Sequence, residues 1–260
     1  MKAILGGLLM AALVATGAEA AVHTEKVAYR HGTVELTGFL AYDDALTAKR
    51  PGVVVVHEWW GLNDFAKGRA EELARLGYVA FAVDMYGSGK VTSDAKEAGQ
   101  LAGAFRSDRG LMRSRAAAGL DVLRGRTQVD PTRLAAIGYC FGGTVALEMA
   151  RSGADLKGVA SFHGGLATPN PADARNIRGK VLVLHGADDS FESPAEIAAF
   201  QEEMRQGGVD WQMNYYGGAV HSFTNPDAGK AGIKGVAYNG AADRRSWQAL
   251  QDFFAEIFRK

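Results

Sequence analysis

The sequence predicts an α/β fold with a mainly parallel central sheet covered by helices on both faces. Two observations carry this prediction. Short apolar runs alternate along the chain with longer segments that have apolar residues at helical spacing, as in parallel strands joined by helices. A glycine-rich turn around Cys140 also joins an apolar run to a helix-forming segment, which is typical of the sharp strand-to-helix turns of such sheets.

Four elements are predicted in the first third of the chain. Residues 34–42 alternate apolar and polar positions and predict an early antiparallel strand. Residues 52–56 are almost all valine, which is typical of a central strand buried on both faces. Residues 64–76 carry alanine and leucine on one face of a helix, and residues 79–83 form the next apolar strand.

The same alternation continues to the carboxyl end. A helix over residues 111–123 precedes a strand at 133–137, which leads through Cys140 into a helix over 144–150. Further strands are expected at 158–162, 181–184 and 211–216, and further helices at 194–204 and 244–258. Ligands of such sheets bind at the carboxyl ends of the strands, so polar residues that directly follow a strand are the candidates for a functional site.

The first 20 residues have the pattern of a secretory signal peptide. Lys2 supplies the positive start, residues 4–14 are an apolar run too short to span a bilayer, and Ala18-Glu19-Ala20 is a small-residue cleavage site before Ala21. Residues 21–260 have a length typical of one α/β domain. We therefore expect a single exported domain, periplasmic or secreted, without membrane association once the signal is removed.

Composition narrows the class of function. The chain has 29 basic and 29 acidic residues and no block of like charge, so neither nucleic acid nor an anionic membrane is an expected partner. A single cysteine excludes an internal disulfide and any multi-cysteine metal cage. We expect a monomer that acts on a small molecule and needs neither a metal nor an organic cofactor.

The one cysteine lies in the segment Gly138-Tyr139-Cys140-Phe141-Gly142-Gly143. This pattern is typical of a nucleophile elbow, with sulfur in the place of a serine oxygen. The glycines allow strand and helix to approach closely, and the amino end of the following helix favours a thiolate. The alternative is a buried, inert cysteine, which is common for a lone thiol.

A thiol nucleophile needs a histidine base and an acid that orients it, and in this architecture the order is nucleophile, acid, histidine. Three of the six histidines precede Cys140, and His163 and His185 end core strands, whereas His221 lies in a loop before the last helix. The acid is expected at the end of the preceding strand, where the Gly-x-x-Asp turn favours Asp189 and its neighbour Asp188 remains the alternative.

Two backbone N–H groups are needed to hold an oxyanion. They are expected from Phe141, directly after the nucleophile, and from Trp59, in the loop after the strand at 52–56. The neighbouring Glu58 has an apolar tryptophan setting that is expected to raise the pKa of its carboxyl group. Its alternative is a solvated loop carboxylate.

Together these motifs resemble the dienelactone hydrolase family of α/β-hydrolases. The resemblance covers nearly all of the mature chain and rests on the elbow, on His57-Glu58-Trp59-Trp60-Gly61-Leu62-Asn63, on Gly186-Ala187-Asp188-Asp189 and on His221-Ser222-Phe223. It implies an α/β-hydrolase fold and a catalytic triad of Cys140, Asp189 and His221. It also implies that Glu58 contacts the cysteine and helps to generate the thiolate as substrate binds.

The chain departs from this family at two positions. Dienelactone hydrolases hold the carboxylate of the lactone with two arginines, and the corresponding positions here are Ser88 and Asn225. We expect both to contact substrate, together with Trp60 and Tyr86. Without the arginines we expect little preference for anionic lactones, unless Arg106 or Arg109 reaches the pocket.

The predicted function is a cysteine-dependent hydrolase of carboxylic esters or lactones. Two alternatives remain open. One is an enzyme of other specificity, such as an aryl esterase or a thioesterase. The other is a thiol sensor or ligand-binding module on a hydrolase scaffold, which would need only Cys140.

Overall fold

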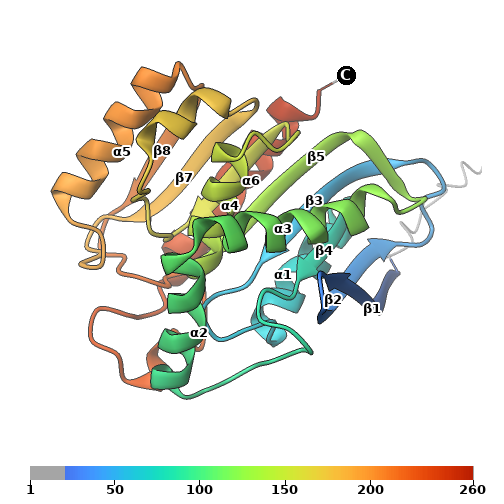
Figure 1. Cartoon of the computed structure of the whole chain (residues 1–260), viewed down its shortest axis with the longest axis horizontal. Coiled ribbons are helices and arrows are strands. Elements are labelled where there is room, and N and C mark those ends of the chain that lie inside the picture. Colours follow the sequence, from blue (N-terminus) through green and yellow to red (C-terminus); the bar gives the residue numbers. More distant parts are fainter. Residues whose placement is uncertain (1–20, 260) are drawn as a thin grey trace, which may run out of the picture.

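In the computed structural model, which describes residues 21–259, the chain forms one eight-stranded sheet with helices on both faces (Figure 1). The strands lie in the order β1-β2-β4-β3-β5-β6-β7-β8. The β1–β2 and β2–β4 pairs are antiparallel and all other pairs are parallel. The strands are β1 (Val22–His31), β2 (Val34–Asp43), β3 (Arg50–Val56), β4 (Val79–Val83), β5 (Val129–Tyr139), β6 (Gly158–Phe162), β7 (Lys180–Gly186) and β8 (Trp211–Tyr216).

Six α-helices within residues 21–259 cover this sheet. They are α1 (Asp64–Arg75), α2 (Ala95–Ser107), α3 (Arg109–Arg124), α4 (Phe141–Arg151), α5 (Pro194–Gly207) and α6 (Gly240–Ile257). Apolar side chains of α1 and α6 form one core with the sheet, and those of α2, α3, α4 and α5 form the other. The mainly parallel α/β fold expected from the sequence is therefore confirmed.

The central strands are apolar because both of their faces are covered. All residues of β4 and β6 are buried, and Val53 to Val56 of β3 are fully inaccessible to solvent. Alternate valines of β3 enter the two cores: Val53 and Val55 face α1 and α6, whereas Val54 and Val56 face α3 and α4. Continuous valine runs suit this double burial.

Every predicted element is present, and one strand and one α-helix of the described residues were not predicted, in addition to two short 3₁₀ helices at Pro171–Asn176 and Ala228–Ala231. The first is β1, an edge strand whose residues alternate between partial burial and exposure, so its sequence contains no apolar run. The second is α2, which buries only Ala98, Ala102 and Phe105 along its length. A helix with so few large apolar residues leaves a weak periodic signal.

The sheet brings the candidate residues to one edge. Glu58 follows β3, Cys140 follows β5, Asp189 follows β7 and His221 follows β8 after a short turn. These strands are parallel, so their carboxyl ends share one rim. The predicted signal peptide, residues 1–20, lies outside the described residues, and no helix within residues 21–259 is long and apolar enough to cross a membrane.

Candidate active site

Cys140 occupies a strained backbone position between β5 and α4. Its φ of 53° and ψ of −116° lie in a region that L-residues rarely adopt, so the surrounding structure must hold the turn in place. The flanking glycines make the turn possible. A Cβ atom on Gly138 would lie 1.9 Å from the Gly142 carbonyl oxygen, and one on Gly142 would lie 2.2 Å from the Val56 oxygen.

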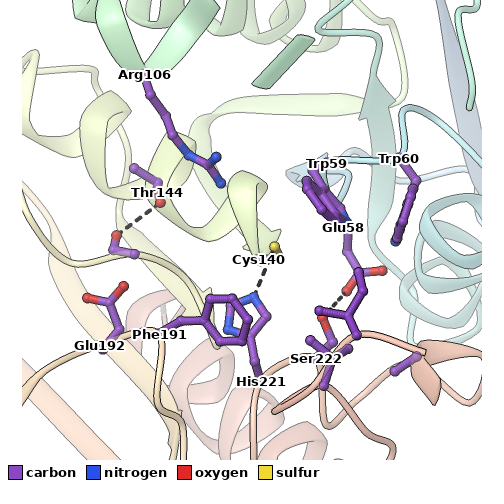
Figure 2. Close-up of a pocket in the computed structure, with 14 residues that line it drawn as sticks. Glu58, Trp59, Trp60, Arg106, Cys140, Thr144, Phe191, Glu192, His221 and Ser222 are labelled. Atoms are coloured by element: carbon purple, nitrogen blue, oxygen red, sulfur yellow. Dashed lines mark hydrogen bonds between the residues drawn. The ribbon is translucent and has the colours of Figure 1, made fainter. Parts of the chain in front are cut away.

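Cys140, His221 and Asp189 form one continuous chain of contacts. The Cys140 Sγ atom lies 3.1 Å from His221 Nε2, and His221 Nδ1 lies 2.8 Å from Asp189 Oδ2 (Figure 2 shows the first contact). Asp189 is buried, whereas Asp188 is exposed and has no contact with the imidazole. Of the two adjacent carboxylates, the structure therefore brings Asp189 to the histidine.

The charge state of His221 follows from these contacts. Burial by itself lowers the pKa of an imidazole, but the Cys140 sulfur and the Asp189 carboxylate outweigh it and hold the pKa of His221 well above its ordinary value. An imidazolium is thereby favoured next to the sulfur. This arrangement suits a thiolate–imidazolium pair.

The two N–H groups expected to form an oxyanion hole flank the cysteine. Phe141 is the first residue of α4, and no side chain caps that helix end among the described residues. Trp59 lies in the turn after β3, where its carbonyl oxygen accepts a hydrogen bond of 2.8 Å from the Tyr86 hydroxyl. In the described part of the chain, the Trp59 N–H has no backbone acceptor.

Glu58 is fully buried and is held by the loop that carries His221. Its Oε1 accepts a hydrogen bond from Ser222 Oγ at 2.8 Å, and its Oε2 accepts one from Asn225 Nδ2 at 2.6 Å. Burial raises the pKa of Glu58, and these two donors offset part of the effect. The expected apolar environment is therefore present, but the carboxylate bonds to Ser222 and Asn225 rather than to the Cys140 thiol.

A cavity of about 300 Å³ opens above Cys140 and His221. In Figure 2, Trp59 and Trp60 lie on one side of the sulfur, and Arg106, Thr144 and Glu192 lie on the other. The remaining lining residues are Glu58, Gly165, Phe191, Ser222, Ala228, Ile233 and Val236. The two tryptophans thus lie on one side of the cavity, and Arg106, Thr144 and Glu192 form what we call its polar side.

Only one of the four residues expected to contact substrate lines this cavity, namely Trp60. The Tyr86 hydroxyl instead donates a hydrogen bond to the Trp59 carbonyl oxygen, and Ser88 is exposed outside the cavity. Asn225 is buried and its amide is committed to Glu58. These three residues therefore do not line the cavity, because position in a sequence motif does not fix the direction of a side chain, and their contact with substrate stays a prediction.

The residues on the polar side of the cavity were largely not predicted from the sequence. Arg106, left open as an alternative, reaches the cavity from the last turn of α2, and it forms no ion pair with a carboxylate in residues 21–259. Arg109 does not line the cavity, because its guanidinium is directed to the Ala167 carbonyl. Glu192 stands three residues after Asp189 in the same loop, which is the signal that could have found it.

Glu192 has an unusual protonation equilibrium. Its carboxylate accepts the Leu166 N–H at 3.1 Å, and burial raises its pKa to about 7, with further increases from Glu196 and Asp189. It can therefore change charge near neutral pH. Within residues 21–259, no group of three or more His, Cys, Asp or Glu side chains is placed to hold a metal ion.

Comparison with known proteins agrees with this geometry. The family model described as "Dienelactone hydrolase family" matches residues 36–258. A dienelactone hydrolase-like promiscuous phosphotriesterase from metagenomic libraries is 45% identical, with a TM-score of 0.90, and the match covers 92% of this chain and 100% of that one. A dienelactone hydrolase from Anabaena variabilis shares the fold at 20% identity, with a TM-score of 0.67 over 92% of this chain and 99% of the other.

A curated relative points the same way. A protein of Aquifex aeolicus with a provisional carboxymethylenebutenolidase name is 27% identical over 236 residues, which cover 88% of this chain and 97% of that protein. The family match extends over nearly all of the described fold and includes every segment that carries a candidate catalytic residue. The chain therefore belongs to the dienelactone hydrolase family, and it is a hydrolase built on the α/β-hydrolase fold.

Proposed function

We propose that the protein hydrolyses carboxylic esters or lactones through a covalent thioester on Cys140. The observation that carries this proposal is the unbroken contact chain from Sγ through the imidazole of His221 to Asp189. An inert structural cysteine needs none of these partners. A nucleophile needs all of them, because the base must be both oriented and charge-stabilised.

The first half of the reaction forms the thioester. The Cys140 thiolate attacks the substrate carbonyl carbon, and the N–H groups of Phe141 and Trp59 stabilise the resulting oxyanion. As the tetrahedral intermediate collapses, the carbon–oxygen bond to the leaving group breaks. The His221 imidazolium gives its Nε2 proton to the leaving alkoxide and becomes neutral.

The second half releases the acid. Neutral His221 takes a proton from a water molecule, which attacks the thioester carbonyl carbon. Collapse of this intermediate breaks the carbon–sulfur bond and restores the thiolate beside the imidazolium. We propose that the family role of Glu58 in generating the thiolate applies to enzyme molecules in which Cys140 is still a thiol beside a neutral His221, and this role requires the Glu58 carboxylate to leave the Ser222 and Asn225 donors first.

A chromogenic aryl ester tests the proposal on the mature protein. We expect a burst of phenol stoichiometric with enzyme, loss of turnover after alkylation of Cys140, and no burst with Cys140→Ala. Cys140→Ser should fold but react poorly, because its base is matched to a thiol. If Cys140→Ala retains the parent rate, the mechanism is wrong. A protein that is alkylated but never turns over ester would instead be the thiol sensor.

The 45% identical neighbour supports a second, minor activity. Its printed name describes a promiscuous phosphotriesterase. A neutral phosphotriester also presents an electrophilic centre with an oxygen that develops negative charge, so the same sulfur and N–H groups can act on it. An assay with an aryl dialkyl phosphate, run with wild type and Cys140→Ala, decides whether such turnover uses this site.

We also propose that the protein is exported and acts as a monomer. The charged start, apolar run and small-residue cleavage site support a leader that is cut before Ala21. Amino-terminal sequencing of exported material should begin at Ala21, and light scattering should give the mass of one chain. An intact Met1 on a membrane fraction would overturn the first statement, and a dimer mass would overturn the second.

A further inference from the structure

His163 is a buried histidine that the proposed mechanism does not use. It directly follows β6, its side chain is fully inaccessible to solvent, and its φ of 40° places it among the few non-glycine residues with a positive φ. Its backbone N–H donates to the Leu184 oxygen at 2.8 Å, which extends the pairing of β6 with β7 by one residue. A bulky side chain held in this conformation indicates that neighbouring contacts fix it.

The ring of His163 contacts the backbone of the nucleophile. Its Nδ1 lies 3.1 Å from the Cys140 nitrogen, and its Nε2 lies 2.8 Å from Thr224 Oγ1. A backbone N–H can only donate, so Nδ1 must be the acceptor and the ring proton must lie on Nε2. His163 is therefore neutral, with one tautomer selected. Burial, followed by the nearby His221, also lowers its pKa, in agreement with this assignment.

These two contacts connect the elbow with the loop of the base. The Cys140 N–H is shared between the Phe162 oxygen, at 3.0 Å, and the His163 ring. On the other side of the ring, Thr224 lies three residues after His221, and its carbonyl oxygen is anchored by Arg69 at 2.8 Å. The His163 ring also packs edge-on against the His221 ring, with centroids 5.5 Å apart.

We propose that His163 is a positioning residue that sets the distance between Cys140 Sγ and His221 Nε2. One end of its ring fixes the strained Cys140 backbone, and the other end fixes the loop that carries His221. One rigid, buried ring thus fixes the positions of both reacting side chains. This inference rests on the proposed nucleophilic role of Cys140, and it adds a residue that contacts neither substrate nor the reacting sulfur.

The test compares substitutions at His163 with a matched control. His163→Leu removes the acceptor and the tether, whereas His163→Asn keeps an acceptor oxygen near the position of Nδ1. His185→Leu is the control, because His185 is a buried histidine near the end of the neighbouring strand β7 and forms no hydrogen bond with Cys140 or Thr224. The readouts are kcat and KM for an aryl ester, the rate of Cys140 alkylation by iodoacetamide, and Tm.

We expect His163→Leu to lower kcat roughly 10- to 100-fold with KM changed less than about threefold, because misplacement by a fraction of an ångström is costly in a preformed site. Alkylation at neutral pH should slow in parallel. His163→Asn should recover the part of the loss that arises at the Cys140 backbone, and His185→Leu should stay within about threefold of wild type in kcat. A lower Tm with unchanged kcat in His163→Leu would overturn the proposal.

Two further comparisons keep the test decisive. If His163→Leu does not fold, Thr224→Val and Thr224→Ser replace it: the valine removes the acceptor of the ring proton and the serine keeps it. Equal kcat for these two would overturn the proposal. Cys140→Ala is measured in parallel. Activity that survives in Cys140→Ala refutes the proposed function, whereas an inactive Cys140→Ala with a fully active His163→Leu refutes only the positioning role.

Discussion

At the residue scale, Asp188 and Asp189 are neighbours in sequence but not in environment. Asp189 is buried with Oδ2 on His221 Nδ1, and Asp188 points to solvent. We expect Asp189→Asn to lower kcat by roughly 10³- to 10⁴-fold, because an amide favours the wrong imidazole tautomer. Asp188→Asn should change kcat less than threefold. Steady-state turnover of an aryl ester checks both variants, and the opposite ranking would show that the acid is Asp188.

A second residue-scale prediction concerns charge on the polar side of the cavity. Glu192 has a pKa of about 7, so its carboxyl group is neutral below that pH and negative above it. The positively charged side chain of Arg106 lines the same cavity. The ratio of kcat/KM for an anionic ester to that for a neutral ester of equal size should therefore fall roughly three- to tenfold as pH rises from 6 to 8. Titration of the shared catalytic groups changes both kcat/KM values by the same factor, so it does not change their ratio.

Variants at both positions test this assignment. Glu192→Gln cannot ionise, so its ratio should stay flat across the same pH range. Arg106→Gln should lower the ratio at every pH while leaving the neutral ester nearly unaffected. A pH-dependent ratio that persists in Glu192→Gln would assign the effect to another group.

Sequence reasoning identified the three residues of the proposed triad, which the structure brings into contact, because chain order and turn chemistry constrain them. Each member follows a strand, and the order Cys140, Asp189, His221 excludes most alternatives. The same reasoning does not determine where the side chains of Ser88 and Asn225 point. In the structure neither lines the cavity, since side-chain direction depends on tertiary contacts such as the hydrogen bond from Asn225 to Glu58.

At the element scale, a strand or helix that buries more apolar surface is easier to predict from the sequence. The strand β4 is apolar throughout and β3 is apolar after its first residue, Arg50; the predicted strands at 79–83 and 52–56 coincide with these apolar residues, apart from the first two residues of β3. The helix α2 buries only two alanines and one phenylalanine, so the apolar periodicity of its sequence is weak. Because α2 was not predicted, the sequence could not place Arg106 in the cavity.

Two helical glycines allow a matched prediction about elements. Gly68 lies inside α1 and a Cβ there meets nothing within 4 Å, whereas a Cβ on Gly142 of α4 would meet the Val56 and His57 carbonyl oxygens at 2.2 and 2.6 Å. Gly68→Ala should stabilise the protein by about 0.5–1 kcal/mol through helix propensity. Gly142→Ala should destabilise it and reduce turnover, because α4 must move away from β3.

Thermal unfolding and ester turnover measure both glycine variants. A rise in Tm for Gly68→Ala shows that the alanine itself is tolerated in a helix of this protein. A Gly142→Ala variant with unchanged Tm and turnover would mean that the close approach of α4 to β3 is not required.

At the scale of the whole molecule, both faces of the sheet combine an apolar core with ion pairs between helices. On one face, Arg69 of α1 pairs with Asp243 of α6 at 2.6 Å beside alanine, leucine and phenylalanine contacts. The opposite face contains a more deeply buried ion cluster that joins α4 to α5. Arg151 of α4 bonds Glu203 of α5 through two hydrogen bonds of 2.8 Å, and it also contacts Glu148 at 3.0 Å.

This cluster gives the last prediction. Arg151 and Glu148 are fully inaccessible and Glu203 is nearly so. Removing the Arg151 cation leaves Glu203 buried without an ion-pair partner among the described residues, whereas Glu148 keeps its pair with Arg113 at 2.7 Å. We expect Arg151→Met to destabilise the fold by about 3–5 kcal/mol, whereas Arg205→Met, in an exposed pair with Glu202, should leave the unfolding midpoint nearly unchanged. The double variant Arg151→Met with Glu203→Leu should recover part of the loss, because it removes one stranded charge. Urea unfolding measures all three. If Arg151→Met costs no more than Arg205→Met, the α4–α5 side of the molecule is held by apolar packing alone.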